Sequence, residues 1–308
     1  MQSKSVNILL ATYQGEKYIE EQLQSLLNQT YDNITIYIRD DGSKDNTLQV
    51  IKNMISNNNT SKKIVLLKNN GNNLGYPDCF WELLTQCETA DFYAFCDQDD
   101  YWYPTKIENA VTHLKSGKEN ALFFHAYEIC NDAMECQYVY SYERNNIRVN
   151  NMLFRVIAQG FSIVITDELR KKVLASKPFC KRLPHDLWCL WIAYIYGGII
   201  HTSDVLAKYR RHENAVTSTH GSFWVKVKGA FSNELSGKSL REVQYRFGLL
   251  LEYFAEDMDQ ETQNDLKRFT KENNNIQGYF SKLFYPKRIM PSFFGELVFR
   301  LAFLLNRM

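Results

Sequence analysis

The sequence predicts an α/β fold in which a mostly parallel sheet carries helices on both faces and is followed by a helical C-terminal extension. Two observations point to it. Through the first half of the chain, short apolar runs alternate with longer stretches whose apolar residues recur every three or four positions. This βαβα order is typical of a parallel sheet with crossover helices. After about residue 221 only the helical spacing remains, interrupted by an Asn-rich break at 272–275.

The expected strands are short apolar runs that end in polar segments. They cover residues 6–11, 34–38, 64–67, 92–96, 121–124 and 160–165, and residues 205–217 are expected to form a strand that leaves into a loop. The expected helices cover residues 16–28, 46–54, 76–84, 104–114 and 185–198. Pro104 suits the first turn of its helix, because proline has no N–H to leave unpaired there.

The change of pattern divides the chain into a sheet-containing domain at 1–220 and a helical region at 221–308. Within the first of these, the regular alternation of apolar runs and amphipathic stretches changes from about Gln159. A chain of 308 residues is long enough for one large domain with an appendage.

Composition and charge exclude some classes of function. The formal net charge of +1 argues against a protein whose whole surface attracts nucleic acid. No run of 18 apolar residues occurs, so no segment is expected to span a bilayer, and the residues before the first strand are too few for a signal peptide. The seven cysteines form no CxxC pair, which favours reduced thiols in a cytosolic protein over disulfides or a zinc site.

Four of the predicted strands end in polar segments that read ATYQGE, RDDGSKDN, NNGNNLG and DQDD. In sheets of this kind, ligands bind beyond the carboxyl ends of the strands. In RDDGSKDN, Asp40 or Asp41 can accept hydrogen bonds from a base or a ribose. The same letters are also an ordinary turn composition, since Asp, Gly and Ser all favour turns.

DQDD crowds Asp97, Asp99 and Asp100 at the end of a strand that reads as buried. Like charges this close repel each other, and more strongly where the local dielectric constant is low. A divalent cation would remove the repulsion, because Mg²⁺ and Mn²⁺ take carboxylate oxygens as ligands and keep positions for phosphate oxygens. The alternative is a solvated acidic loop in which Asp100 lies favourably near the N-terminus of the following helix.

Together these segments resemble a known family. ATYQGEKYIEEQLQSLLNQTY, IRDDGSKDNT, NNGNNLG and FCDQDDYWYPTKI are similar, in order and spacing, to the nucleotide-sugar half of family-2 glycosyltransferases. The resemblance covers roughly residues 5–215. DQDDYW with the following Pro-x-Lys, and YRRHENAVT later, look most like bacterial rhamnosyltransferases of cell-wall, capsule or O-antigen polysaccharide synthesis. The resemblance implies a GT-A fold, with 1–125 as the nucleotide-sugar half and 126–220 as the acceptor half.

The resemblance also assigns a donor site. Asp41 would bind the base with support from Asp40, and Arg210 and Arg211 would neutralise the diphosphate. The whole nucleotide-sugar-binding set would be Ala11, Thr12, Tyr13, Glu16, Asp40, Asp41, Asn70, Gly71, Asp97, Gln98, Arg210 and Arg211. Asp97, Asp99 and His212 would hold Mn²⁺ or Mg²⁺, unless His212 is simply solvated. The family usually has a basic residue after the Asn-Gly segment, and GNNLGYPD has none.

A base and an acceptor site follow from the same resemblance. Inverting members use a carboxylate at the start of a helix, usually in a Glu-Asp pair, and PHDLWCLW offers Asp186 with His185 in place of the glutamate. Such a carboxylate can take the proton of an acceptor hydroxyl, whereas the alternative is that Asp186 is only a helix N-cap. The expected acceptor contacts are Trp102, Gly160, His185 and Trp188, although large aromatic residues in such patterns are usually core.

The implied function is an inverting, metal-dependent transfer of a sugar to a saccharide acceptor that is lipid-linked, in surface polysaccharide synthesis. L-rhamnose from dTDP-rhamnose is the first choice of donor, and UDP-glucose, UDP-galactose or UDP-N-acetylglucosamine are the alternatives. A noncatalytic nucleotide-sugar-binding subunit of a glycan-assembly complex is an alternative from another class.

The end of the chain combines apolar and basic side chains. From residue 267 onward the sequence has eight Lys or Arg against two Glu, which suits contact with an anionic membrane surface. Packing on the catalytic domain, or on a second copy in a homodimer, is the alternative. We expect a cytoplasmic protein that reaches the inner face of the cell membrane and binds no nucleic acid.

Overall fold

The structure is a computed structural model. It describes residues 3–69, 71–143, 153, 157–176, 183–211, 238–270, 275–287, 289, 293, 296, 297 and 300. The chain forms two compact units, residues 1–144 with 158–212 and residues 145–157 with 213–308. The domain boundary expected at residue 220 falls in the segment 212–237, outside the described residues.

The first unit, here the sheet unit, is built on a sheet that has nine strands in the described residues. Its order is β3-β2-β1-β4-β8-β6-β9-β5, with β7 paired to β6. The strands are β1 (Val6–Thr12), β2 (Ile34–Asp40), β3 (Lys63–Leu66), β4 (Phe92–Cys96), β5 (Tyr101–Trp102), β6 (Leu122–Cys130), β7 (Cys136–Tyr140), β8 (Ile163–Thr166) and β9 (Ile199–Arg210). As predicted, β1 to β4 are parallel, and Val6 lies beside both Ile34 and Phe92.

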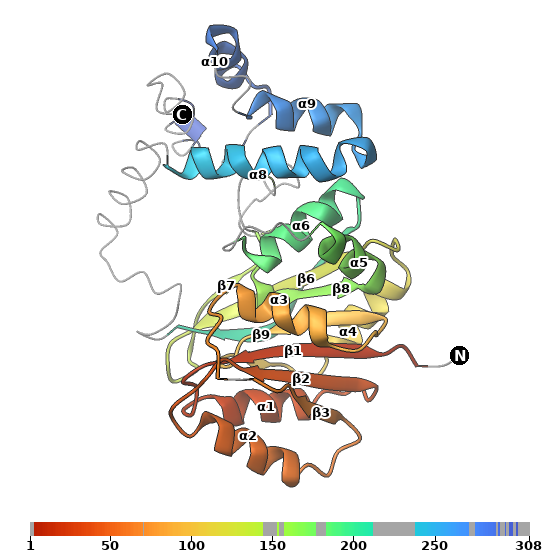
Figure 1. Ribbon diagram of the computed structural model, residues 1–308, viewed down its shortest axis with the longest axis vertical. Helices are drawn as coiled ribbons and strands as arrows, with labels where there is room; N and C mark the ends of the chain where they lie inside the picture. Colours follow the sequence, from red (N-terminus) through yellow and green to blue (C-terminus); the bar gives the residue numbers. More distant parts are fainter. Residues whose placement is uncertain are drawn as a thin grey trace. The chain divides into compact units, whose positions relative to one another are not determined.

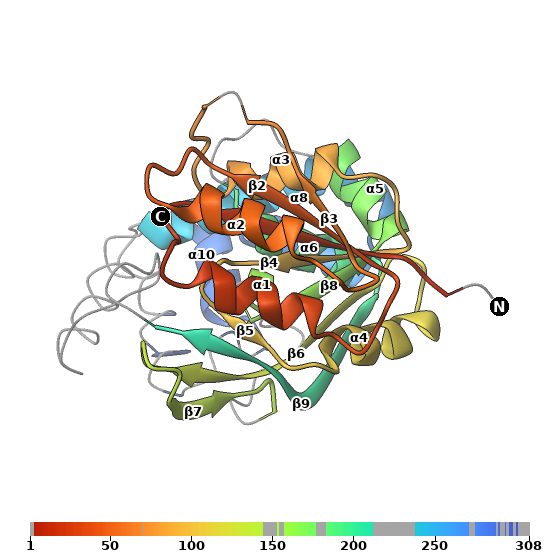
Figure 2. The ribbon, with the colours of Figure 1, turned by 90° about the horizontal axis from the view of Figure 1, so that it is seen from below.

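Helices cover both faces of this sheet, as predicted. They are α1 (Ile19–Leu27), α2 (Thr47–Ser56), α3 (Asp78–Gln86), α4 (Lys106–Lys115), α5 (Asp167–Ala175) and α6 (His185–Ile195). α1 and α2 lie on one side of β1 and β2, and α3 lies on the other (Figure 1). Viewed from below, α1 and α2 run side by side in front of the strands (Figure 2). α5 packs on β4, on β8 and against α6.

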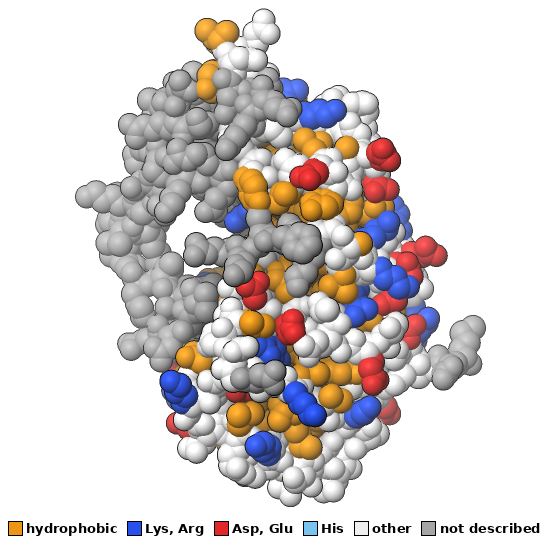
Figure 3. Space-filling view, in the orientation of Figure 1, with side chains coloured by type: hydrophobic (Ala, Val, Ile, Leu, Met, Phe, Trp, Pro, Cys, Tyr) orange, Lys and Arg blue, Asp and Glu red, His pale blue; other side chains and the backbone are white. Residues whose placement is uncertain are grey.

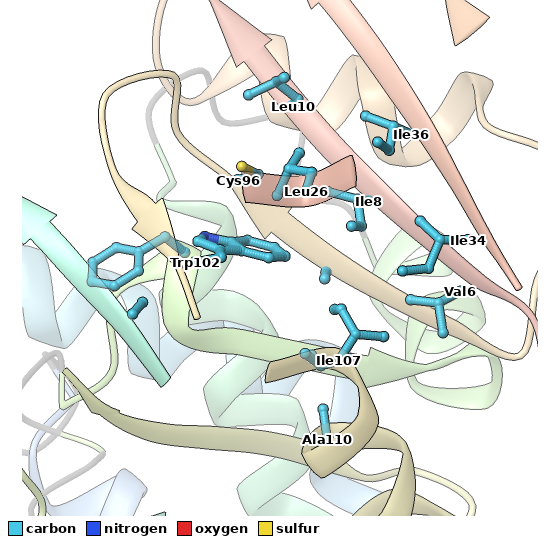
Figure 4. Packing of buried hydrophobic residues seen from close by; sticks show 14 of the residues in the cluster. Val6, Ile8, Leu10, Leu26, Ile34, Ile36, Cys96, Trp102, Ile107 and Ala110 are labelled. Carbon is cyan, nitrogen blue, oxygen red and sulfur yellow. The ribbon is translucent and has the colours of Figure 1, made fainter. Parts of the chain in front are cut away.

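The main hydrophobic core lies between the sheet and the helices α1 and α4 (Figure 4). Val6, Ile8 and Leu10 alternate along β1 and share this face, as the two-residue period of a strand requires. Leu26 of α1 and Ile107 of α4 pack into the same cluster. Burying each of these side chains stabilises the fold by about 1.5–3 kcal/mol, so this layer fixes the strands whose ends carry the polar segments.

The later strands differ from the predicted pattern in direction and extent. β8 is antiparallel to both β4 and β6, and β5 is antiparallel to β9, so the sheet is mixed beyond β4. Residues 160–162 form a 3₁₀ turn before β8 rather than the start of a strand. β9 begins at Ile199 rather than at residue 205, because its first part carries half-exposed polar residues that an apolar-run criterion misses.

Helix α5 is absent from the sequence prediction. Its sequence DELRKKVLA buries only Leu169 and Val173, so the apolar stripe is too thin to recognise. The signal that could have found it is the cap, since Thr166 Oγ1 accepts a hydrogen bond from Leu169 N at 3.4 Å and Asp167 and Glu168 follow.

The second unit, here the helical unit, contains α8 (Lys238–Phe254), α9 (Gln260–Arg268) and α10 (Ile276–Leu283). Asp259 caps α9 by accepting from Thr262 N at 2.7 Å, and Asn275 caps α10 by accepting from Gly278 N at 2.8 Å. These helices confirm the predicted helical extension. No helix within the described ranges is long and apolar enough to cross a membrane.

On the face drawn in Figure 3, Lys and Arg side chains are interspersed with Asp and Glu side chains over the described residues. This mixture agrees with the formal net charge of +1.

Candidate active site

The polar segments meet because their strands are parallel neighbours. β1 lies between β2 and β4, and Thr12 at the end of β1 is paired with Asp40 at the end of β2. The carboxyl ends of three strands therefore open at one edge of the sheet, where ligands of such sheets bind. Asp97 to Asp100 directly follow β4 at this edge, and we call these four residues the aspartate loop.

Asp40 organises the turn after β2. Its carboxylate accepts hydrogen bonds from Thr12 Oγ1 at 3.0 Å and from the N–H groups of Gly42 and Ser43 at 3.2 and 2.9 Å. Gly42 has φ of 86°, a conformation that side chains other than glycine rarely adopt. The buried Asp40 therefore holds the end of β1 and the turn together, as the supporting role expected for it requires.

Asp41 is held more tightly than the sequence suggests. Arg39 Nη2 donates to its carboxylate at 3.0 Å, and the N–H groups of Leu74 and Gly75 donate at 2.9 and 2.7 Å. Asp41 is buried, so these three bonds use most of its acceptor capacity. In this structure Asp41 anchors the loop after β3, and its contact with a nucleotide base stays a prediction.

Gln98 locks the aspartate loop to the loop after β1. Its side-chain amide accepts from Tyr13 N at 2.8 Å and donates to Tyr13 O at 2.9 Å, which copies the pairing of two strands. A Cβ on Gly15 would come within 2.1 Å of Gln98 Oε1, so a larger residue there would displace the Gln98 amide from Tyr13. The Tyr13 side chain is left half-exposed beside the site.

The remaining residues expected around the nucleotide occupy varied positions. Ala11 is half-buried on β1 beside Arg39 of β2, and Gly71 is exposed with φ of 81°. The Glu16 carboxylate accepts from Asn46 N at 2.9 Å, next to the start of α2. Arg211 is exposed, and its N–H donates to Cys130 O at 2.9 Å. Asn70 and His212 lie outside the described residues.

The carboxylates of the aspartate loop repel one another, as the sequence predicts. Burial, Asp99 and Asp186 together raise the pKa of Asp97 from 3.8 to about 7. Asp100 is fully buried, and burial with the charges of Asp99 and Asp97 raises its pKa well above the usual range. Asp100 Oδ1 accepts from Arg210 N at 3.2 Å, whereas Oδ2 has no hydrogen-bond partner among the described residues.

Arg210 does not face the donor site, contrary to the sequence prediction. Its Nε donates to Asp99 O at 2.9 Å, and its two terminal nitrogens bind Asp132 O and the Glu21 carboxylate. The side chain is buried and also lies over the Tyr18 ring. Because every nitrogen of this guanidinium is used by the protein, Arg210 fixes the aspartate loop to α1 instead of pairing with a diphosphate.

Asp186 reaches the same place from a distant part of the sequence. It is the second residue of α6, and Pro184 rather than Asp186 occupies the N-cap position. Its carboxylate accepts a hydrogen bond from Leu187 N at 2.8 Å, and the nearby Gly160 backbone and Tyr76 side chain also lower its pKa. Burial outweighs these contributions and raises the pKa from 3.8 to about 6. Asp186 in turn raises the pKa of Asp97, so the two carboxylates lie near each other.

The two tryptophans expected to stack on a sugar are core residues, so that prediction is wrong. Trp102 is fully buried in the main core, with Lys106 Nζ 3.1 Å from its ring centroid. Trp188 is fully buried as well, and its Nε1 donates to Ser176 Oγ at 3.3 Å. Burial of a large aromatic ring stabilises a core, and a buried indole N–H usually finds a hydrogen-bond partner. Trp188 has such a partner, whereas Trp102 Nε1 has none among the described residues.

His185 also lies beneath the site rather than on its surface. Its ring is buried, stacks on Phe80 with a centroid distance of 4.2 Å and lies tilted against Phe95 with a centroid distance of 4.5 Å. Burial lowers the pKa of His185 from 6.5 to about 3, so the ring is neutral. A Cβ on Gly160 would come within 2.8 Å of His185 Nε2, and this explains the glycine. Gly160 and His185 thus position Asp186 and have no surface to offer an acceptor.

Asp97 and Asp99 have the chemistry of a divalent-metal site. Hard cations prefer carboxylate oxygens, and a cation would relieve the repulsion that raises the pKa of Asp97. Among the described residues no three His, Cys, Asp or Glu side chains converge as a complete metal cage. Two carboxylates leave coordination positions for phosphate oxygens, so the residues fit an ion that is shared with a bound nucleotide diphosphate.

A sheet with loops at its carboxyl edge and a buried carboxylate close by has the site of an α/β enzyme that binds nucleotide-linked ligands. Residues 7–167, just over half of the chain, match the family model described as Glycosyl transferase family 2. The chain belongs to this family and is a glycosyltransferase. The match ends before Asp186, so its proposed role as the base rests on the geometry of the site and on the resemblance of PHDLWCLW to the family's inverting members.

Relatives and solved structures agree with this assignment. An uncharacterised glycosyltransferase of Rickettsia prowazekii (strain Madrid E) is 24% identical over 314 residues, covering 99% of this chain and 92% of the relative. The dTDP-rhamnosyl transferase RfbG of Shigella flexneri is 28% identical over 237 residues, covering 71% of this chain and 77% of the relative.

The fold is similar to S. aureus TarS 1–349 in complex with UDP-GlcNAc, with a TM-score of 0.61, 16% identity, and coverage of 99% of this chain and 82% of that one. It is also similar to the mannosyltransferase PcManGT from Pyrobaculum calidifontis in complex with GDP-Man and Mn²⁺, with a TM-score of 0.55, 12% identity, and coverage of 99% and 86%. These likenesses confirm the GT-A fold.

Sequence reasoning missed two residues of the site. The Tyr76 side chain lies near Asp186 and lowers its pKa, but nothing in the local sequence links residues so far apart. Lys106 lies buried beside the aspartate loop. Its place in DQDDYWYPTK is a signal that could have found it, since it opens the helix that follows the aspartates.

We predict that replacing Asp97 by asparagine stabilises the metal-free protein. Because the pKa of Asp97 is raised from 3.8 to about 7 on folding, its ionisation costs stability from about pH 4 upward and costs most above about pH 7. Asp97→Asn should therefore raise the melting temperature at pH 8 and change it little at pH 4. The gain in unfolding free energy is at most about 4 kcal/mol. Melting curves in EDTA measure it, and a lower melting temperature at pH 8 would contradict it. Asp32→Asn, at an exposed position, is the control.

Proposed function

We propose that this glycosyltransferase inverts the anomeric centre of a nucleoside-diphosphate sugar and transfers the sugar to a saccharide hydroxyl in surface polysaccharide synthesis. One observation carries the proposal. Asp186 and the aspartate loop come from opposite halves of the sheet unit, and yet the charge of Asp186 contributes to the raised pKa of Asp97. A base and a diphosphate-binding loop that face each other are what a direct displacement needs.

The reaction would be one displacement. The acceptor oxygen attacks the anomeric carbon as the bond from that carbon to the diphosphate oxygen breaks, and the nucleoside diphosphate leaves with the electron pair. Asp186 takes the proton of the attacking hydroxyl. With a pKa of about 6 its carboxylate is mostly ionised at pH 7 and still basic enough to accept. Mn²⁺ or Mg²⁺ held by Asp97 and Asp99 would supply positive charge to the leaving diphosphate.

We propose dTDP-rhamnose as the donor. The relative from Shigella flexneri carries dTDP-rhamnosyl transferase in its name, and DQDDYW with the later YRRHENAVT resembles rhamnosyltransferases. UDP-linked sugars are the alternative, which the complex of TarS with UDP-GlcNAc supports. Thermal stabilisation across dTDP-, UDP- and GDP-sugars with Mn²⁺ or Mg²⁺ tests the choice, since a ligand that binds the native state raises the melting temperature. Stabilisation by UDP-sugars alone would overturn dTDP-rhamnose.

We also propose that the acceptor is lipid-linked and that the helical unit meets the inner face of the cell membrane. The support is an excess of basic residues after residue 267 together with exposed apolar side chains. Phe280, Phe284 and Phe293 are 55%, 72% and 80% exposed. Exposed aromatics beside basic residues favour the interface of an anionic bilayer. A homodimer that buries the same side chains is the alternative.

Asp99→Asn should remove most of the metal-dependent binding of a nucleoside diphosphate, because a neutral amide is a weaker ligand for a hard cation. Calorimetry with UDP and dTDP, each with Mn²⁺ and with EDTA, measures the metal-dependent part. Asp204→Asn on the exposed part of β9 is the control. Unchanged metal-dependent affinity in Asp99→Asn would remove this residue from the proposed metal site.

Asp186→Asn should fold and bind donor normally and transfer sugar at least about a hundredfold more slowly, the usual scale for loss of a general base. In the wild-type enzyme the rate should fall as the pH drops below about 6, because protonated Asp186 cannot accept the acceptor proton. Initial rates from pH 5 to 8 check both statements, with Glu168→Gln as an exposed control. Near-normal transfer by Asp186→Asn would place the base elsewhere.

Deleting residues 292–308 should leave donor binding intact and lower activity on a lipid-linked acceptor more than on a short soluble one, because the strand-end loops do not include the tail. Flotation of the full and shortened proteins with anionic vesicles tests the membrane contact. Arg300 donates to Leu283 O at 2.6 Å, so the deletion removes a packing contact as well. Phe293→Ser with Leu297→Ser, both at exposed positions, keeps the contact and removes only the apolar surface. If the full-length protein does not float, the tail is core or a dimer contact.

A further inference from the structure

Lys106 is fully buried in the sheet unit, a rare position for a lysine. It is the first residue of α4, just after the aspartate loop and β5. The four-carbon stem runs through the main core, and the charged end stays inside the protein instead of reaching water. Burying an ammonium group costs free energy unless it is paired and hydrogen-bonded, so its surroundings need an explanation.

The ammonium group has two direct contacts. Nζ donates to Phe161 O at 2.5 Å and lies 3.1 Å from the centroid of the Trp102 ring. A carbonyl and an aromatic face both stabilise a cation. These contacts keep Lys106 between the segment that follows the aspartate loop and the 3₁₀ turn Gly160–Ser162.

Asp97, Asp100 and the Cys96 thiol lie near the same amino group. Burial lowers the pKa of Lys106 well below its usual range, and these three neighbours oppose the shift only in part. In return, the positive charge of Lys106 lowers the pKa of Asp97 and of Asp100. Asp100 Oδ2 lacks a hydrogen-bond partner in the described part of the chain. Lys106 is thus a buried hydrogen-bond donor next to the aspartate loop, and in its charged form it offsets the crowding of the carboxylates.

The turn that Lys106 holds is also the turn that holds Asp186. Phe161 O accepts from Lys106, and the backbone of the preceding Gly160 lies against Asp186 and lowers its pKa. One buried side chain therefore connects the aspartates after β4 to the carboxylate on α6 through two successive residues.

We propose that Lys106 is a positioning residue of the transfer site, which ties the aspartate loop to the Gly160–Ser162 turn and so fixes Asp97 and Asp99 relative to Asp186. This inference rests on the proposed function, since it assumes that the aspartates hold a divalent cation. Lys106 would then contribute to both metal binding and transfer, although it touches no substrate.

Lys106→Met tests this role, because methionine fills nearly the same space without the charge or the donor. Mn²⁺ affinity without nucleotide, measured by the loss of the free-ion EPR signal, should fall at least about tenfold, because Asp97 and Asp99 lose the side chain that fixes them. Loss of the positive charge by itself would act in the opposite direction and strengthen cation binding. The variant should also transfer sugar more slowly through kcat.

Two control variants separate this role from simple packing. Lys115→Met removes an exposed charge from the same helix, and Ile107→Val shortens the neighbouring core side chain without changing charge. Both should keep Mn²⁺ affinity within about twofold, even where Ile107→Val lowers the melting temperature by an amount typical of a lost methyl group. If Lys106→Met also keeps wild-type affinity and kcat, the lysine is only a core residue and the inference is overturned.

A second measurement uses the unmodified protein and so does not depend on the variant folding. The Trp102 ring should shift the NMR signals of the Lys106 CεH₂ protons upfield, which identifies them. Titration with Mg²⁺ should move these signals and leave those of Lys115 in place. Signals that stay fixed while Mg²⁺ binds would overturn the role of Lys106 alone. If the wild-type protein binds neither Mg²⁺ nor Mn²⁺, the proposed metal site fails and takes this inference with it.

Discussion

Repulsion among the carboxylates at the end of β4 is the constraint that the rest of the site satisfies. Asp97, Asp99 and Asp100 follow a fully buried strand, and Asp186 adds a fourth carboxylate from the other side. Three sets of contacts hold the loop in place. Gln98 pairs with the backbone of Tyr13, Arg210 holds Asp99 O from the α1 side, and the buried Lys106 lies below. These contacts hold the loop in place, while its carboxylates still repel one another. Such a loop is suited to bind a cation together with an anionic ligand.

The proposed donor and acceptor sides of the site are built in different ways. The proposed donor side consists of loops that directly follow β1, β2 and β4, so parallel pairing alone brings them together. The proposed acceptor side depends on α6, on the Gly160–Ser162 turn and on Tyr76, which come from separate stretches of the chain. A change of acceptor can therefore arise in the second group of residues without disturbing the strands that carry the first.

The sequence predicts the first half of the fold well, because each of those strands is a continuous apolar run and each helix has a clear stripe. It fails where the local pattern is weak. The first part of β9 is polar and half-exposed, and α5 buries only two residues. The direction of β8 depends on which strands it pairs with, and no short segment contains that information.

The same division holds for the site. The position of the aspartate loop and of Asp186 follows from motifs and strand order. The inward turn of Arg210 depends on Asp132 and Glu21, and the burial of Lys106 depends on Phe161 O and Trp102. Apart from Trp102, these partners are distant in the sequence. Such distant partners decide where a long side chain lies. Residue type alone therefore predicted that Arg210 contacts a phosphate, whereas in the structure Arg210 is buried and connects the aspartate loop to α1.

The place of β8 has a consequence for how the chain reaches this state. β4 pairs with β1 on one side and with β8 on the other. During synthesis β4 is complete long before β8 emerges. Until then, the backbone N–H and C=O groups on one edge of the apolar segment FYAFC have no strand to pair with. An exposed, apolar strand edge is a template for aggregation. A nascent or truncated chain that ends near residue 125 would contain all loops of the proposed donor side and would still be prone to aggregation. The loops of the proposed donor side are thus complete well before β8, at Ile163–Thr166, can cover this edge of β4.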